Sequence, residues 1–132
     1  MELRTLQKIA VSALEDIKAK EIEILNTARR TDLFARMIIA CGDSGRQVRA
    51  LARNVAGKVR AAGGEVLSVE GEENGEWVLI DLGDIVVHVM QPAVRAFYNL
   101  EELWGTGIGK QWPARTSHRP EGRDFKTELV LR

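Results

Sequence analysis

The chain has 132 residues, of which 45% are hydrophobic and 29% charged, a composition typical of one compact domain and not of a disordered chain. Basic and acidic side chains number 19 each, so the net charge of zero excludes a strongly positive overall field but not a local basic patch. The longest apolar run, Met37–Cys41, is far shorter than the roughly 20 residues that a membrane helix needs. One cysteine and two histidines exclude an internal disulfide and argue against a zinc site. We expect a soluble cytoplasmic protein.

The first predicted element is an amphipathic helix over residues 2–18, where apolar side chains recur at helical spacing. Two short strands are predicted next, Ile22–Asn26 and Met37–Cys41, with a polar connection between them. A third strand is predicted over Glu65–Val69, after a second helix.

The second helix is the clearest in the chain. Asp43 or Ser44 can cap its first-turn amides, and the pair Gly63-Gly64 is suited to its end. One face of this helix is apolar, and the opposite face carries four arginines, Arg46, Arg49, Arg53 and Arg60. Such a stripe is common on solvated helices, and it also suits contacts with phosphates or an acidic partner.

A β-hairpin is predicted over residues 77–90. Two runs rich in β-branched residues flank Gly83-Asp84, which suits a two-residue turn. With this turn Leu82 lies opposite Ile85, and the strands build a wholly aliphatic face that we assign to the core. The other face mixes apolar and polar groups, namely Trp77, Leu79, Asp81, Val86, His88 and Met90.

Two explanations of that mixed face remain open. Either a helix of the same chain covers it, or part of it is exposed as a docking surface. His88 is more often a hydrogen-bonded structural residue on such a strand than a ligand or base. Asp81 and Asp84 are the one carboxylate pair that could hold Mg²⁺ for nucleotidyl transfer, but no second acid alternates with Asp81 along its strand. The residues therefore predict no catalytic site, no metal and no cofactor.

The last predicted helix begins at Pro92. Its inner face is predicted to carry Ala93, Ala96, Phe97, Leu100, Leu103 and Trp104. Residues 105–132 hold six basic and three acidic side chains. We therefore predict a folded domain over residues 1–105 and a flexible basic tail over residues 106–132.

Short motifs in this order and spacing resemble the bacterial ribosomal silencing factor family, also called the RsfS or Iojap family. The resemblance covers about residues 3–105 and leaves out the tail from about Gly107. It departs from the family at Ala35, where many members have Asp before the strand. The matching motifs include Met37-Ile38-Ile39, Arg46-Gln47-Val48, Trp77, Asp81-Leu82-Gly83-Asp84, Val87-His88-Val89-Met90, Arg95, Tyr98, Leu100-Glu101 and Leu103-Trp104.

The resemblance implies an α/β fold, with a mixed sheet of about five strands flanked by helices and a nucleotidyltransferase-like topology without active-site carboxylates. It implies a non-enzymatic repressor of translation that binds the large ribosomal subunit through large-subunit protein fourteen. The bound factor would block joining of the small subunit when nutrients are scarce. Alternatives are a Mg²⁺-dependent nucleotidyltransferase-like enzyme and a large-subunit assembly or RNA-binding factor.

The docking face that the resemblance implies is formed or supported by Trp77, Asp81, Leu82, His88, Met90, Tyr98 and Glu101. Among them we expect Trp77 and Leu82 to be the anchors, because large apolar side chains at a hairpin end or turn suit that role. The four arginines of the second helix and the basic tail would add contacts with ribosomal RNA or an acidic partner. A homodimer away from the ribosome is also compatible with the resemblance.

Overall fold

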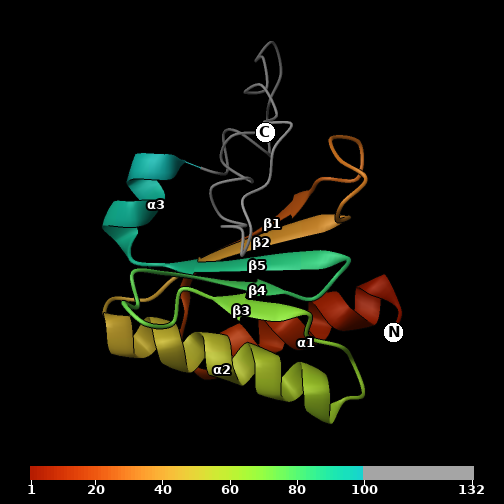
Figure 1. The fold of residues 1–132 in the computed structure, drawn as a ribbon, viewed down its shortest axis with the longest axis horizontal. Helices are drawn as coiled ribbons and strands as arrows, with labels where there is room; N and C mark the ends of the chain where they lie inside the picture. The colour runs from red at the N-terminus through yellow and green to blue at the C-terminus, as the bar shows by residue number, and fades with distance from the viewer. Residues whose placement is uncertain (100–132) are drawn as a thin grey trace.

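A computed structural model describes residues 1–99 of the chain, except for the side chain of Tyr98. These residues form three helices and five strands in a mixed order (Figure 1). The elements are α1 (Leu3–Asp16), β1 (Lys20–Asn26), β2 (Arg36–Cys41), α2 (Gly45–Ala61), β3 (Ser68–Glu70), β4 (Trp77–Asp81), β5 (Ile85–Met90) and α3 (Pro92–Tyr98).

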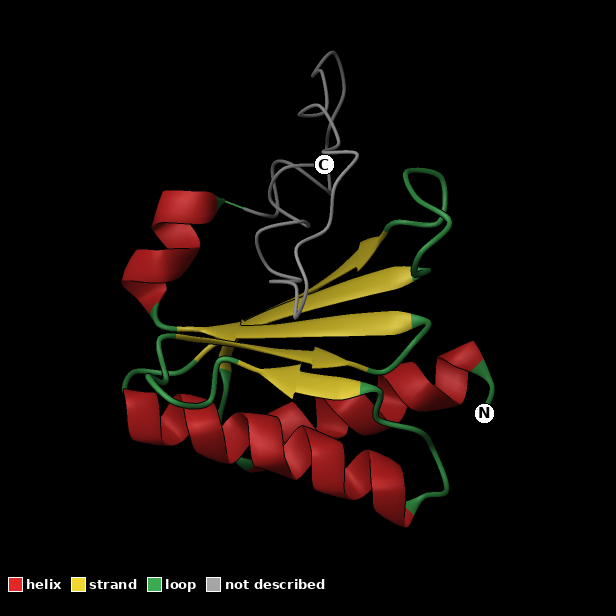
Figure 2. Cartoon of the chain, viewed as in Figure 1, coloured by secondary structure: helices red, strands yellow, loops and turns green. Residues whose placement is uncertain are grey.

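The strands form one sheet in the order β1-β2-β5-β4-β3. The central pair β2 and β5 is parallel, and the other neighbours are antiparallel. This arrangement confirms the predicted α/β fold with a mixed five-stranded sheet. Both long helices, α1 and α2, lie on one face of the sheet (Figure 2), so that face holds the main hydrophobic core. We call this the helix side and the opposite face the second face.

The predicted hairpin is confirmed in its register. The amide of Leu82 donates to the carbonyl of Ile85 at 2.9 Å, and Ile80 lies opposite Val87. Gly83 has φ +90, a left-handed conformation that favours glycine at this turn. The aliphatic face of the hairpin belongs to the helix-side core, as predicted.

The start of α2 is fixed by two side chains. The Ser44 hydroxyl accepts from the amide of Gln47 at 3.1 Å, which makes Ser44 the predicted N-cap. The Gln47 carboxamide accepts from the amide of Asp43 at 2.8 Å and donates to the carbonyl of Ile17 at 3.2 Å. These bonds join the start of α2 to the end of α1. The helix ends at Ala61, just before the Gly63-Gly64 pair, and Gly63 has φ +86.

Two predicted elements differ in the structure. Strand β3 begins at Ser68 and not at Glu65, and Leu67 before it is exposed, although its amide donates to the carbonyl of Asp81. The predicted inner face of the last helix is wrong within the described residues. Ala93, Ala96 and Phe97 are exposed, with Phe97 80% accessible.

The reason lies in how α3 is attached. This helix rises away from the end of β5 and does not lie flat on the sheet (Figure 1). Its residues nearest the sheet are therefore Val94, which is half-buried against the second face, and Arg95, which is buried. The predicted residues Leu100, Leu103 and Trp104, and the tail, lie outside the described residues. The helices described in residues 1–99 include none with the length and hydropathy of a membrane-spanning segment.

Candidate interaction surface

The second face is built mainly by the hairpin. Register places Trp77 opposite Met90, Leu79 opposite His88, and Asp81 opposite Val86. The face is buried, with Trp77 7% exposed and Met90 fully covered. Phe34, from the connection between β1 and β2, and Val94 of α3 pack into the same cluster of residues. The side chains of this face are therefore buried, although α1 and α2 lie on the other side of the sheet and α3 does not lie flat on it.

Trp77 and His88 form a buried polar pair within this apolar face. The indole Nε1–H of Trp77 donates to Nδ1 of His88 at 2.8 Å, and the ring centroids lie 5.7 Å apart. Because Nδ1 accepts this bond, a neutral His88 carries its proton on Nε2. The prediction that His88 is a hydrogen-bonded structural residue is confirmed.

Asp81 ends β4 beside the hairpin turn. Its residue is 8% exposed, and its Oδ1 accepts from the amide of Gly83 at 2.9 Å. Burial raises the pKa of the Asp81 carboxyl above its ordinary value of 3.8, and the bond from Gly83 opposes part of that rise. The carboxylate therefore helps to form the turn, and its burial makes the charged form less favourable than it is in water.

The raised pKa of Asp81 predicts a pH-dependent gain in stability for Asp81→Asn. The folded state binds the proton more tightly than the unfolded state, so wild-type stability falls as the pH rises through the raised pKa. An asparagine Oδ1 can still accept from Gly83 and carries no charge. We expect the variant to be more stable than wild type at pH 7, with a difference that shrinks below about pH 4. Urea unfolding from pH 3 to pH 8 measures it.

The exposed neighbour Asp84 provides the matched control, because Asp84→Asn changes charge at the same turn without burial. A stability difference between wild type and Asp81→Asn that stays constant from pH 3 to pH 8 would contradict the account of Asp81.

The remaining predicted docking residues occupy different places. Leu82 is 6% exposed and packs in the helix-side core, so the hairpin tip does not project beyond that core. Tyr98 is the last residue of α3, and Glu101 lies outside the described residues. The structure thus brings Trp77, Asp81, His88 and Met90 together on one face and separates Leu82 from them. A contact of any of these residues with a partner stays a prediction.

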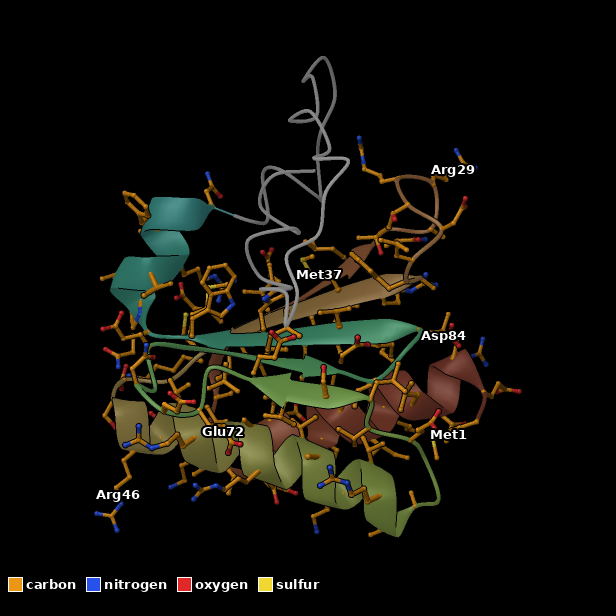
Figure 3. The ribbon with its side chains drawn as sticks, in the orientation of Figure 1. Met1, Arg29, Met37, Arg46, Glu72 and Asp84 are labelled. Atoms are coloured by element: carbon orange, nitrogen blue, oxygen red, sulfur yellow. The ribbon has the colours of Figure 1, made fainter. Side chains whose placement is uncertain are left out.

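The arginine stripe lies on the opposite layer of the molecule. Helix α2 contains five basic residues and no acidic one. Arg46 projects outward from its first turn (Figure 3), and Arg60 near its end is also exposed. Arg53 forms a 3.3 Å ion pair with Glu72, while Arg49 is half-buried. Three of the four predicted arginines, Arg46, Arg53 and Arg60, are thus exposed, and Arg53 is paired with an acidic residue.

The residues 1–99 contain no group of three or more side chains suited to hold a metal ion. Asp84 is exposed at the hairpin turn (Figure 3), and its backbone carbonyl accepts from the amides of Ala35 and Arg36. Asp81 is bonded to Gly83. Within residues 1–99, neither Asp81 nor Asp84 belongs to a group of three side chains that could bind a metal ion.

Sequence reasoning missed two residues near this face. Phe34 is 3% exposed in the second-face cluster although it lies in a polar connection, where no periodic pattern marks it. Arg95 is not among the residues predicted for the inner face of its helix, but it is 9% exposed and contacts Cys41, which is buried. The only signal for Arg95 was its place among the family-like motifs.

The chain matches a known protein family over nearly its full length. The family described as "Ribosomal silencing factor during starvation" matches residues 1–129, so the match continues past residue 105, where the motif resemblance ended. A Chromobacterium violaceum protein named Ribosomal silencing factor RsfS is 52% identical over 121 residues, covering 86% of this chain and 99% of that protein. A crystal structure from the same organism has a TM-score of 0.78 and 54% identity, covering 86% of this chain and 92% of that one.

A more distant relative is a mouse protein named for mitochondrial assembly of the ribosomal large subunit. It is 29% identical over 100 residues, which cover 71% of this chain and 42% of the mouse protein. The match of the family profile to nearly the full length, together with a relative more than half identical, is decisive. The chain belongs to the RsfS family of ribosomal silencing factors.

Proposed function

We propose that this silencing factor binds the large ribosomal subunit through large-subunit protein fourteen and blocks joining of the small subunit, which lowers translation when nutrients are scarce. The observation that carries the proposal is the 52% identity with a named silencing factor across almost its entire length. The name of the mouse relative supports the large subunit as the partner. The protein would act in the cytoplasm, where bacterial ribosomes work.

The hairpin and α3 would provide the docking surface, which we define as the hairpin end at Trp77 and Met90 together with α3. Five of the predicted docking residues are buried, so they would support this surface from within the fold. They are Trp77, Asp81, Leu82, His88 and Met90. The sequence places Tyr98 at the end of α3 and Glu101 three residues later, where they would contact the ribosomal protein. A charged contact made by Glu101 would fix the orientation of the complex and raise the association rate more than it raises the affinity.

Subunit joining provides the direct test of silencing. Large subunits are premixed with the protein, small subunits are added, and light scattering follows the formation of joined ribosomes. We expect joining to fall in proportion to the occupied fraction of large subunits. Full joining at saturating occupancy would contradict the blocking mechanism while leaving binding intact.

We also propose that binding, and not nucleotide chemistry, is the activity of this domain. The Asp81 carboxylate is bonded to the amide of Gly83, and Asp81 and Asp84 are not part of a larger group of metal-binding side chains in residues 1–99. Incubation with Mg²⁺ and nucleoside triphosphates should give no turnover. Turnover that needs Mg²⁺ and disappears in Asp81→Ala would support the enzymatic alternative.

Basic groups would add electrostatic affinity for ribosomal RNA without selecting the site. Arg46 and Arg60 are exposed on α2, and the region from residue 105 adds six basic side chains. Each lost phosphate contact should reduce the slope of log affinity against log salt by about one unit. We expect a shallower slope both for Arg46→Gln with Arg60→Gln and for a chain ending at residue 106. Slopes equal to wild type in large-subunit binding would remove this contribution.

A further inference from the structure

Helix α3 is the shortest helix in residues 1–99. It has seven residues, and helices shorter than about 12 residues are marginal on their own in water. Among its described side chains, the half-buried Val94 and the buried Arg95 are the ones that are not exposed. Both residues contact the sheet: Val94 packs against the second face, and Arg95 bonds a backbone carbonyl of β1.

The Arg95 guanidinium joins α3 to the edge strand β1 and to its neighbour β2. Its Nη1 donates to the carbonyl oxygen of Glu21 at 2.6 Å and lies 3.2 Å from the Cys41 sulfur. Its Nη2 lies 3.6 Å from a carboxylate oxygen of Glu23. A planar guanidinium can reach several acceptors at once, whereas an ammonium group cannot reproduce that geometry. One side chain thus connects α3 with β1 and β2.

The acceptor on β1 has an unusual backbone. Glu21 has φ 49, a left-handed conformation that residues with a Cβ rarely adopt. It lies where the register between β1 and β2 shifts, between Lys20 and Glu23. An irregular residue of this kind persists when its surroundings fix it, and the short bond from Arg95 is such a constraint. The bond from Arg95 therefore stabilises the irregular backbone at Glu21.

We propose that Arg95 is a positioning residue of the docking surface: its guanidinium fastens α3 to the bulged start of β1 and so fixes α3, and Tyr98 with it, relative to the hairpin. The inference rests on the proposed function. Arg95 acts through α3, because its guanidinium is occupied by groups of the same chain. Loss of this attachment should free α3 and leave the sheet and the helix-side core in place.

The test compares Arg95→Met, which keeps the apolar stem, with Arg95→Lys, which keeps the charge. Arg29→Met is the matched control, since Arg29 is an exposed arginine at the far end of the sheet from α3 (Figure 3). We expect Arg95→Met to bind large subunits about tenfold to hundredfold more weakly, as the loss of charged hydrogen bonds implies. Arg95→Lys should lose about threefold and the control nothing.

Two further measurements separate positioning from general stability. Amide hydrogen exchange should accelerate in residues 94–99 of Arg95→Met and stay at wild-type rates in the hairpin. In a double-mutant cycle, Tyr98→Ala should cost less binding in the Arg95→Met background than in wild type, because the arginine acts through the same helix. If Arg95→Met does not fold, Arg95→Lys undergoes the same measurements.

Several results would overturn the proposal. Additive losses in the cycle, wild-type exchange in α3, or exchange that rises equally in the hairpin would each do so. A variant that binds as tightly as wild type overturns the role of Arg95 and leaves the proposed function standing. A wild-type chain that does not bind large subunits overturns both.

Discussion

Replacing Trp77 with alanine should lower the free energy of unfolding by about 3–5 kcal/mol, which is typical of a large buried aromatic side chain. The indole is 7% exposed in the second-face cluster, and its N–H bonds the buried His88 at 2.8 Å. The variant therefore loses apolar contacts and leaves Nδ1 of His88 without its indole donor. Thermal unfolding should show a fall of about 10 °C or more for a domain of this size.

Trp77→Phe provides the control that separates these two losses. Phenylalanine keeps an aromatic ring in the cluster and removes the N–H donor, so we expect a smaller cost of about 1–2 kcal/mol. Large-subunit binding should be measured for both variants well below their melting temperatures. An alanine variant that melts as wild type but no longer binds would mean that Trp77 is an exposed anchor, contrary to its burial in this structure.

Replacing Leu82 with alanine is the second change with a large expected effect, about 2–4 kcal/mol of stability. Leu82 is 6% exposed and packs in the helix-side core next to the hairpin turn. Its loss should leave a cavity between the hairpin and the helix layer. Any loss of large-subunit binding should then follow the unfolded fraction, measured by urea unfolding under the binding conditions.

Leu67 offers a matched control for this change. It is a leucine near the same turn but is 55% exposed, so Leu67→Ala should cost less than about 0.5 kcal/mol. Equal stability losses at the two positions would contradict the core assignment of Leu82. Lost binding by a Leu82→Ala protein of wild-type stability would instead support its role as an anchor.

The hairpin and the second helix could be predicted from the sequence because local rules determine them. Gly83-Asp84 between two β-branched runs specifies a tight turn. This turn determines the register in which β4 pairs with β5. Ser44 before a run with helical spacing specifies the start of α2. In both cases neighbouring residues supply the constraint, so no knowledge of distant contacts is needed.

The attachment of α3 could not be predicted in the same way. Helical periodicity identifies apolar stripes, and it placed Phe97 inside because it assumes that the helix lies on a core. In the structure Arg95 points inward because it bonds Glu21 and Cys41. These partners lie more than 50 residues earlier in the chain, so a local pattern cannot predict the contact. The bulge that exposes the Glu21 carbonyl has no sequence signal, since the residue is not a glycine.

The burial of the second face could not be predicted from the sequence either. Its alternation along β4 and β5 was evident, but Asp81 and His88 left its exposure open. Their burial is helped by particular partners: the amide of Gly83 bonds Oδ1 of Asp81, and the indole of Trp77 bonds Nδ1 of His88. Family resemblance supplied the docking residues, and pattern alone could not have separated supporting residues from those that contact a partner.

The central claim is that this chain binds the large ribosomal subunit, and co-sedimentation tests it most directly. The full chain is mixed with isolated large subunits, isolated small subunits or joined ribosomes, and each mixture is sedimented through a sucrose cushion. The account predicts that the protein sediments in a one-to-one ratio with large subunits, and at background levels with small subunits and joined ribosomes. Equal sedimentation with both isolated subunits, or none with large subunits, would contradict it.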